Sequence, residues 1–186
     1  MERRIHVLKE AGLFAGQLAV RMKRDAINDI IGEDLALQDY LAEELREFAF
    51  DEDDPVSCMK YAAKVLETLN KASDHINKGY KLGLSEDERQ LTDMLFGFAP
   101  HNYQQEYVDL AKEVAVYINK KLRGVDGQKL SRERRKMLVG KMLTNIDNIA
   151  KKRGIGFDRS RGYCFELMYV GEWLENRICS KQALFI

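Results

Sequence analysis

Apolar residues recur at steps of three and four along most of this chain, which is the spacing of one face of an α-helix. The pattern predicts a long helix over residues 3–31, whose apolar positions include Ile5, Leu8, Leu18, Met22, Ile27 and Ile30. A second helix is expected over 35–49, with a stripe of Leu37, Leu41, Leu45 and Phe48. A third begins at Pro55, and its expected core-facing stripe consists of Met59, Ala62, Leu66, Leu69, Ser73, Ile76 and Tyr80.

The middle of the chain predicts two more helices. Ser85 and Glu88 have the spacing of a capping box and open a shorter helix, which Pro100 is expected to stop. Asn102 with Gln105 repeats the capping pattern and opens a helix whose seam consists of Tyr103, Tyr107, Leu110, Val114, Tyr117 and Lys121. We expect this helix, over residues 103–123, to lie near the centre of the fold.

Short polar residues and glycines mark further helix boundaries. Asp34 and Asp54 are expected N-caps, and Pro55 suits the first helical position after Asp54. Ser131 is expected to cap a helix that ends at Gly154. The expected core-facing residues of this helix are Leu138, Met142, Ile146 and Ile149. In the first helix, the four-residue spacing of Gly12 and Gly16 would allow another helix to approach closely.

The C-terminal segment has two interpretations. Residues 157–170 have a partly alternating, aromatic pattern that would suit a short β-hairpin around Ser160–Gly162. The residues from Leu167 to Ile178 instead fit a helical face, and no other region offers a strand as a partner. The helix is therefore favoured, with the hairpin as the alternative.

These elements predict an all-α fold. We expect residues 1–186 to form a single compact domain, a bundle of six or seven helices, because the chain has an ordinary domain length and only two prolines. Its three cysteines are widely spaced, as reduced thiols of a cytoplasmic protein would be, and no apolar run is long enough to span a bilayer. We expect no membrane association, and the sequence leaves the oligomeric state open.

The formal charge is divided into two opposite blocks, although the total is zero. The acidic region, residues 33–109, contains 18 Asp or Glu against 7 Lys or Arg, and the basic region, residues 119–161, contains 4 against 14. Such asymmetry indicates a surface for nucleic acid, or acidic and basic surfaces that meet within or between molecules.

The basic region supplies candidate nucleic-acid-binding residues. Clustered Lys and Arg can neutralise phosphates without reading sequence. A solvated charged face, or cations that complement a helix C-terminus, would explain the same residues without a ligand. The candidates are Lys129, Arg132, Arg134, Arg135, Lys136, Lys151, Lys152, Arg153, Arg159 and Arg161.

The acidic region supplies candidate partner-binding residues. A helical acidic surface between Glu33 and Asp54 could imitate a phosphate backbone and occupy the nucleic-acid site of a partner protein. The candidates are Glu43, Glu44, Glu47, Asp51, Glu52, Asp53 and Asp54.

A second interpretation of some of these acids is a magnesium site, because carboxylates are the hard oxygen ligands that Mg²⁺ prefers. The candidate ligands are Glu43, Glu44, Glu47, Glu106 and Asp109. They resemble the Glu-Glu-x-x-Glu and Glu-x-x-Asp pairs of the all-α nucleoside triphosphate pyrophosphohydrolases. That resemblance implies Mg²⁺ as cofactor, although here about 58 residues separate Glu47 from Glu106.

No phosphate-binding glycine loop, dinucleotide fingerprint or serine nucleophile elbow is present, and no catalytic residue is assigned. The sequence therefore favours a non-enzymatic adaptor, inhibitor or regulator that uses no cofactor. We expect it to bind a protein partner and so to dock on a macromolecular complex, one that handles nucleic acid. Direct nucleic-acid binding through the basic region is the first alternative, and magnesium-dependent pyrophosphohydrolase activity is the second.

Overall fold

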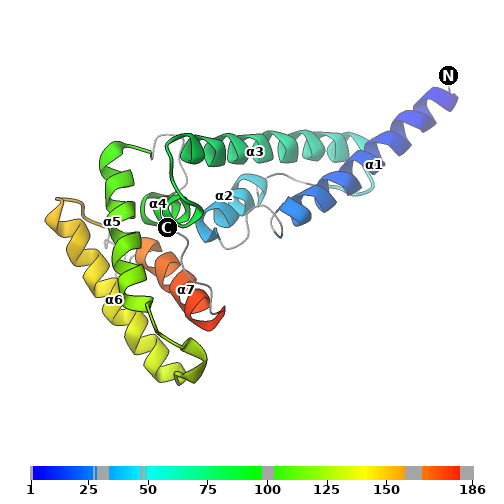
Figure 1. The fold of residues 1–186 in the computed structure, drawn as a ribbon. Coiled ribbons are helices and arrows are strands. Elements are labelled where there is room, and N and C mark those ends of the chain that lie inside the picture. The colour runs from blue at the N-terminus through cyan, green and yellow to red at the C-terminus, as the bar shows by residue number, and fades with distance from the viewer. Residues whose placement is uncertain are drawn as a thin grey trace. The chain divides into compact units, whose positions relative to one another are not determined.

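The computed structural model describes residues 2–26, 28, 34–46, 48, 50–97, 103–157 and 165–180. Within these ranges it contains seven α-helices and no strand, so the predicted all-α class is confirmed (Figure 1). The elements are α1 (Glu2–Asp25), α2 (Leu35–Arg46), α3 (Pro55–Lys81), α4 (Glu86–Phe96), α5 (Gln105–Leu122), the 3₁₀ turn η2 (Gly127–Lys129), α6 (Arg132–Lys152) and α7 (Phe165–Ser180).

The helices belong to two compact units. Unit 1 is Met1–Asn77 and unit 2 is Lys78–Ile186, so α3 begins in the first unit and its last turn belongs to the second. The predicted single compact bundle is therefore not confirmed, and each unit is described by itself.

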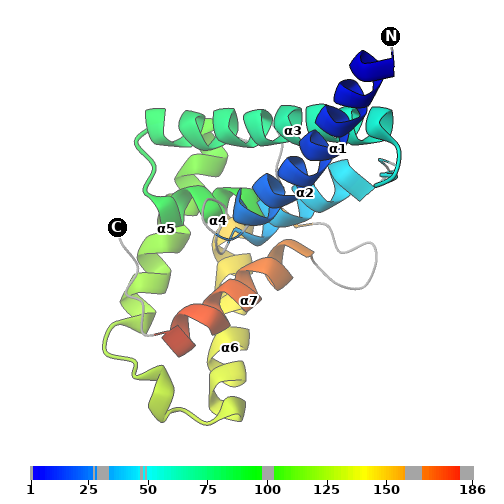
Figure 2. The ribbon, with the colours of Figure 1, turned by 90° about the vertical axis from the view of Figure 1, so that its right-hand side faces the viewer.

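In unit 1, α1 crosses the start of α3 at the two glycines. A β-carbon built on Gly12 would lie 2.7 Å from the β-carbon of Pro55, and one on Gly16 would lie 2.7 Å from that of Cys58. The expected close approach of another helix at this glycine pair is therefore confirmed. The first turns of α1 extend beyond the N-terminal end of α3 in Figure 1, and they rise above α3 in Figure 2.

The buried face of α3 differs from the predicted one by about one residue. Met59 and Leu66 were expected in the core but are 55% and 46% exposed. The buried positions are Cys58, Tyr61, Val65, Thr68, Ala72 and His75. This stripe includes the polar residues Thr68 and His75, which a search for apolar spacing does not find. The buried Thr68 hydroxyl donates a hydrogen bond to the Lys64 carbonyl at 2.8 Å, so its polar group has a partner.

In α1, too, the buried face is not the one that carries the large apolar residues. Ile5, Leu8 and Leu18 are exposed, whereas Gly16 and Ala19 are buried. Small residues are buried here because the close crossing with α3 leaves no room for larger ones. In α2, by contrast, the predicted Leu37, Leu41 and Leu45 are all buried.

In unit 2, α4 packs against α5 and α7, and α6 packs against both α5 and α7. Every residue of α4 from Asp87 to Leu95 is buried, so α4 occupies the central position that was expected for the helix over 103–123. Phe96 stacks on Tyr107 of α5, with ring centroids 4.0 Å apart. The tryptophan of α7, Trp173, is fully buried.

Most predicted helix starts are confirmed. Asp34 accepts a hydrogen bond from the Leu37 amide, and Asp54 accepts from the amides of Val56 and Ser57. The Ser85–Glu88 capping box is complete in both directions, and Ser131 caps α6.

Two predicted boundaries of α5 and α4 differ from the structure. The N-cap of α5 is Gln104, which makes no side-chain capping bond. Gln105 is therefore the first residue of the helix, and the prediction that it forms a capping box with Asn102 is wrong. Asn102 and Pro100 lie outside the described residues. Helix α4 ends at Phe96, and its C-cap residue Gly97 has a φ of 74°, which favours glycine.

At the C-terminus, the helical interpretation is supported from Phe165 onward, because α7 spans Phe165–Ser180. The turn of the alternative hairpin, Ser160–Gly162, lies outside the described residues, and the hairpin is not confirmed.

Candidate functional site

The N-terminal end of α6 carries exposed cations. Arg132, Arg134 and Lys136 are exposed, and among the described residues no ion pair involves them. Arg132, Arg134 and Arg135 lie in the first turn of α6, at the positive end of its dipole, where cations destabilise a helix. Arg135 donates from Nη1 to the Cys179 sulfur at 3.2 Å. Helix stabilisation therefore does not explain this arginine cluster.

The other candidate cations have structural partners. Lys151 pairs with Asp147 at 2.8 Å, Arg153 with Glu113 at 2.7 Å, and Lys129 with Asp126 at 3.2 Å. Lys151 and Lys152 also lie in the last turn of α6, where cations complement the helix dipole.

The described candidates on α6 do not form one patch. Arg132 and Lys152 stand at opposite ends of the helix, which a rise of 1.5 Å per residue separates by about 30 Å. Arg159 and Arg161 lie outside the described residues.

The acidic candidates are mostly exposed and help to begin α3. Asp51, Glu52, Asp53 and Asp54 are exposed, and Asp51 accepts a hydrogen bond from the Asp53 amide. The Cys58 thiol donates to the Asp51 carbonyl at 3.4 Å. Burial raises the pKa of Cys58, and the charges of Asp54, Asp51 and Glu52 raise it further.

The magnesium prediction draws on both units. Glu43 is exposed on α2 and Glu44 there pairs with Lys64 at 2.9 Å, whereas Glu106 and Asp109 lie on α5. Glu47 lies outside the described residues. In the part of the chain that the structure describes, no three His, Cys, Asp or Glu side chains gather as metal ligands would. The shared site stays a prediction.

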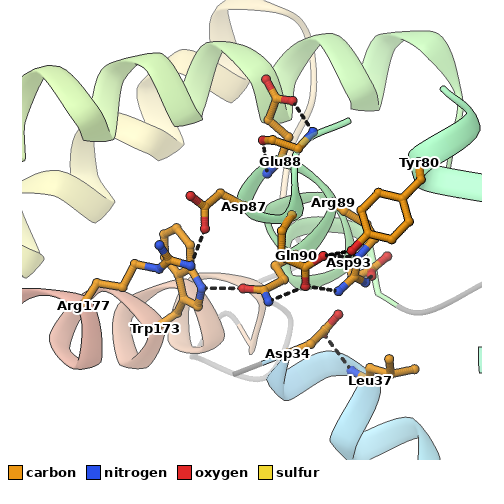
Figure 3. Close-up of polar contacts among 12 residues, drawn as sticks. Asp34, Leu37, Tyr80, Asp87, Glu88, Arg89, Gln90, Asp93, Trp173 and Arg177 are labelled. Carbon is orange, nitrogen blue, oxygen red and sulfur yellow. Dashed lines mark hydrogen bonds and ion pairs between the residues drawn. The ribbon is translucent and has the colours of Figure 1, made fainter. Parts of the chain in front are cut away.

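A network of buried charges, which the sequence did not predict, lies along α4 (Figure 3). The guanidinium of Arg89 binds Glu86 Oε1 at 2.7 Å and Asp93 Oδ2 at 2.8 Å, and the side chains of Arg89 and Asp93 are almost completely buried. Tyr80 donates its hydroxyl to Glu86 Oε2 at 2.6 Å.

The pKa of Glu86 reflects two opposed effects. Burial raises it, but the hydrogen bonds and charge of Arg89, together with the donors Tyr80 and Gln90, lower it by more. The pKa of Tyr80 is raised, first by its hydrogen bond to Glu86 and then by burial. Glu86 is therefore held as a carboxylate and Tyr80 as a neutral phenol.

The same network joins α4 to α7. Gln90 donates to Glu86 at 2.8 Å and accepts a hydrogen bond from the Trp173 indole at 2.9 Å. Arg177 forms an ion pair with Asp87, and its guanidinium lies 4.3 Å from the centre of the Trp173 ring. These contacts lie within unit 2, and they fix the register of α4 against α7.

The sequence contains a local signal for this network. Glu86, Arg89 and Asp93 follow one another at steps of three and four, so they share one side of a helix. Such a pair pattern normally indicates a solvated face, and only packing shows that this one is buried.

Unit 1 exposes two apolar stripes at helical spacing. On α1 the stripe is Val7, Ala11, Phe14 and Leu18, and Phe14 is 66% exposed. On α3 it is Val56, Met59, Ala63 and Leu66. Single exposed apolar residues are ordinary, but contiguous stripes mark interaction surfaces.

None of the helices in the described ranges combines the length and apolar character that crossing a membrane requires. Comparison with known protein families, with curated proteins and with solved structures found no match to this chain.

Proposed function

We propose that this protein is a non-enzymatic adaptor, inhibitor or regulator that docks on a protein partner through the exposed stripe of α1. The observation that carries the proposal is the exposure of Val7, Phe14 and Leu18 on one side of this helix, away from the buried Gly12 and Gly16. Helices that bind in grooves present apolar anchors at this spacing.

The size of the stripe is adequate for a docking site. Burying one Phe or Leu side chain that was exposed contributes about 1.5–3 kcal/mol. A few such anchors, led by an aromatic residue, commonly supply most of the binding energy of a protein interface. Phe14 is the expected anchor because it is the largest exposed side chain of the stripe.

The acidic residues that precede α3 indicate a second property of the partner. Asp51, Asp53 and Asp54 are exposed immediately before Val56, the first residue of the α3 stripe. A partner that covers this part of α3 would combine apolar anchors with basic groups, as nucleic-acid-binding surfaces do. This supports a partner from a complex that handles nucleic acid.

Affinity capture from the native host, followed by mass spectrometry, tests this function. Phe14→Glu and Leu18→Glu should each remove the captured partner, because each buries a charge in the interface. Val116→Glu is the matched control, since Val116 is a single exposed valine of α5 in unit 2. Equal capture by the wild type and by both α1 variants would contradict docking through α1.

Direct nucleic-acid binding is the second candidate, and the arginine-rich first turn of α6 favours it. Arg132→Glu, Arg134→Glu and Lys136→Glu together should flatten the dependence of log affinity on log salt by about two to three units, because each neutralised phosphate releases a counterion. An unchanged slope, or no binding at low salt, would leave the protein-partner function alone.

A further inference from the structure

A hollow on unit 2 lies between α5 and α6 and has a volume of about 520 Å³. This is within the usual range for small-molecule sites. Its lining combines an aromatic ring, two amides, one aliphatic side chain and two ammonium groups, contributed by Tyr117, Asn145, Asn148, Ile149, Lys151 and Lys152.

Two polar groups of the hollow, on Tyr117 of α5 and Asn145 of α6, hold each other in place. Asn145 Nδ2 donates to the Tyr117 hydroxyl at 3.0 Å and to the Lys141 carbonyl at 3.0 Å. Both N–H bonds of this amide are thereby used, so the carbonyl oxygen of Asn145 is the group that it offers to a ligand. One turn before Tyr117, Glu113 is bound to Arg153 across the same pair of helices.

The charge of the hollow suits an anion. Lys151 is paired with Asp147, but Lys152 is exposed, and in the part of the chain that is described it forms no ion pair. Lys120 and Lys121 follow Tyr117 by about one turn and are also exposed. The acids nearest to these cations in the two helices, Glu113 and Asp147, are each neutralised by a partner.

We propose that this hollow binds one nucleotide of a single-stranded nucleic acid. Tyr117 would stack on the base, Asn145 and Asn148 would bind its polar edge, and Lys152 would bind a phosphate. Aromatic rings beside a basic groove are the usual means of binding unpaired strands. Duplex bases are stacked and paired, so they cannot enter the hollow without being flipped out.

This site differs from the arginine cluster at the other end of α6 and does not depend on docking through α1. A short fluorescein-labelled oligothymidine, with a labelled duplex of equal length as comparison, is titrated with the full chain by fluorescence anisotropy. We expect the single strand to bind more tightly than the duplex, and its affinity to fall with salt.

Four variants locate the binding. Tyr117→Leu should weaken binding of the single strand about 5- to 150-fold by removing the stacking ring, whereas Tyr117→Phe should keep most of it. Lys152→Glu should weaken binding and flatten the salt dependence by about one unit. Lys136→Glu reverses the same charge at the other end of α6 and should have a smaller effect than Lys152→Glu.

The circular dichroism spectrum and melting temperature of each variant show whether it is folded. Three results would overturn the proposal: no binding of the single strand at low salt, equal affinity for single strand and duplex, or wild-type affinity in a folded Tyr117→Leu variant. A loss of binding in Lys136→Glu with none in Lys152→Glu would also overturn it, and would assign the contact to the arginine cluster.

Discussion

The Trp173 indole Nε1 donates a hydrogen bond of 2.9 Å to Gln90 Oε1, across 83 residues of sequence. Both side chains are buried. The amide nitrogen of Gln90 in turn donates a hydrogen bond to Glu86 at 2.8 Å. One side-chain contact thus joins the packing of α7 to the buried charges of α4.

Removing either partner of this bond should destabilise the protein. Gln90→Leu and Trp173→Phe each leave a buried polar group without its partner, so each should lower the free energy of unfolding by about 1–3 kcal/mol. Urea denaturation followed by far-ultraviolet circular dichroism measures this, and the double variant gives the coupling. Strictly additive losses would show that the two residues do not act together.

The close crossing of α1 and α3 predicts that Gly16→Ala destabilises the protein. In Gly16→Ala the new β-carbon would lie 2.7 Å from the Cys58 β-carbon, so the helix backbones must separate. The overpacking cost of about 1–3 kcal/mol should exceed the gain of about 1 kcal/mol in helix propensity, and the melting temperature should fall.

Gly140→Ala is the control for that substitution. Gly140 lies in α6, and a β-carbon there would have no atom within 4 Å. The substitution should therefore raise stability by about 0.5–1 kcal/mol. If both variants melted alike, steric contact at the α1–α3 crossing would not be the cause.

Stability in acid should depend on Glu86. Its pKa is lowered in the folded protein, so its contribution is present above the unfolded pKa of about 4.3 and is lost as the pH falls through the lower folded value. Glu86→Gln removes this dependence. The difference in unfolding free energy between the wild type and Glu86→Gln should shrink as urea titrations move from neutral pH to about pH 3. A constant difference would contradict the assignment.

Cys58 and Cys179 should differ in reactivity. Cys58 is buried, and burial followed by the acids around it raises the pKa of its thiol, whereas Cys179 is exposed. In a Cys164→Ser background, an alkylating reagent should modify Cys179 first and reach Cys58 only through unfolding. Mass spectrometry of timed samples measures the order, and urea should equalise the two rates. Faster alkylation of Cys58 in the folded protein would contradict its burial.

Local signals predicted the helices well. Asp54 with Pro55, and Ser85 with Glu88, identified helix starts because a cap is made by residues two or three apart in the chain. The stripe of α2 was predicted for a related reason, since three of its four buried positions are leucine and the fourth is Ala36. Where the apolar residues of a helix occupy only one face, the sequence predicts which face is buried.

The functional surfaces were less predictable. In α3, Met59 and Leu66 compete with Tyr61 and Val65 for the same core, and the sequence contains both stripes. The basic block was recognised, but which cations have partners depends on residues of other elements, such as Glu113 for Arg153.

The sequence alone determined that the chain is helical and where most helices begin, because hydrogen bonds and caps within a helix join near neighbours. Only the tertiary structure decided which faces of α1 and α3, and which charges of α4, are buried. Met59 is exposed and Arg89 is buried because burial depends on what distant segments place opposite them, such as α1 against α3 and α7 against α4. A charge enters a core when partners close by compensate its lost hydration, as Glu86 and Asp93 do for Arg89, and no spacing along one helix shows whether the surroundings will be dry.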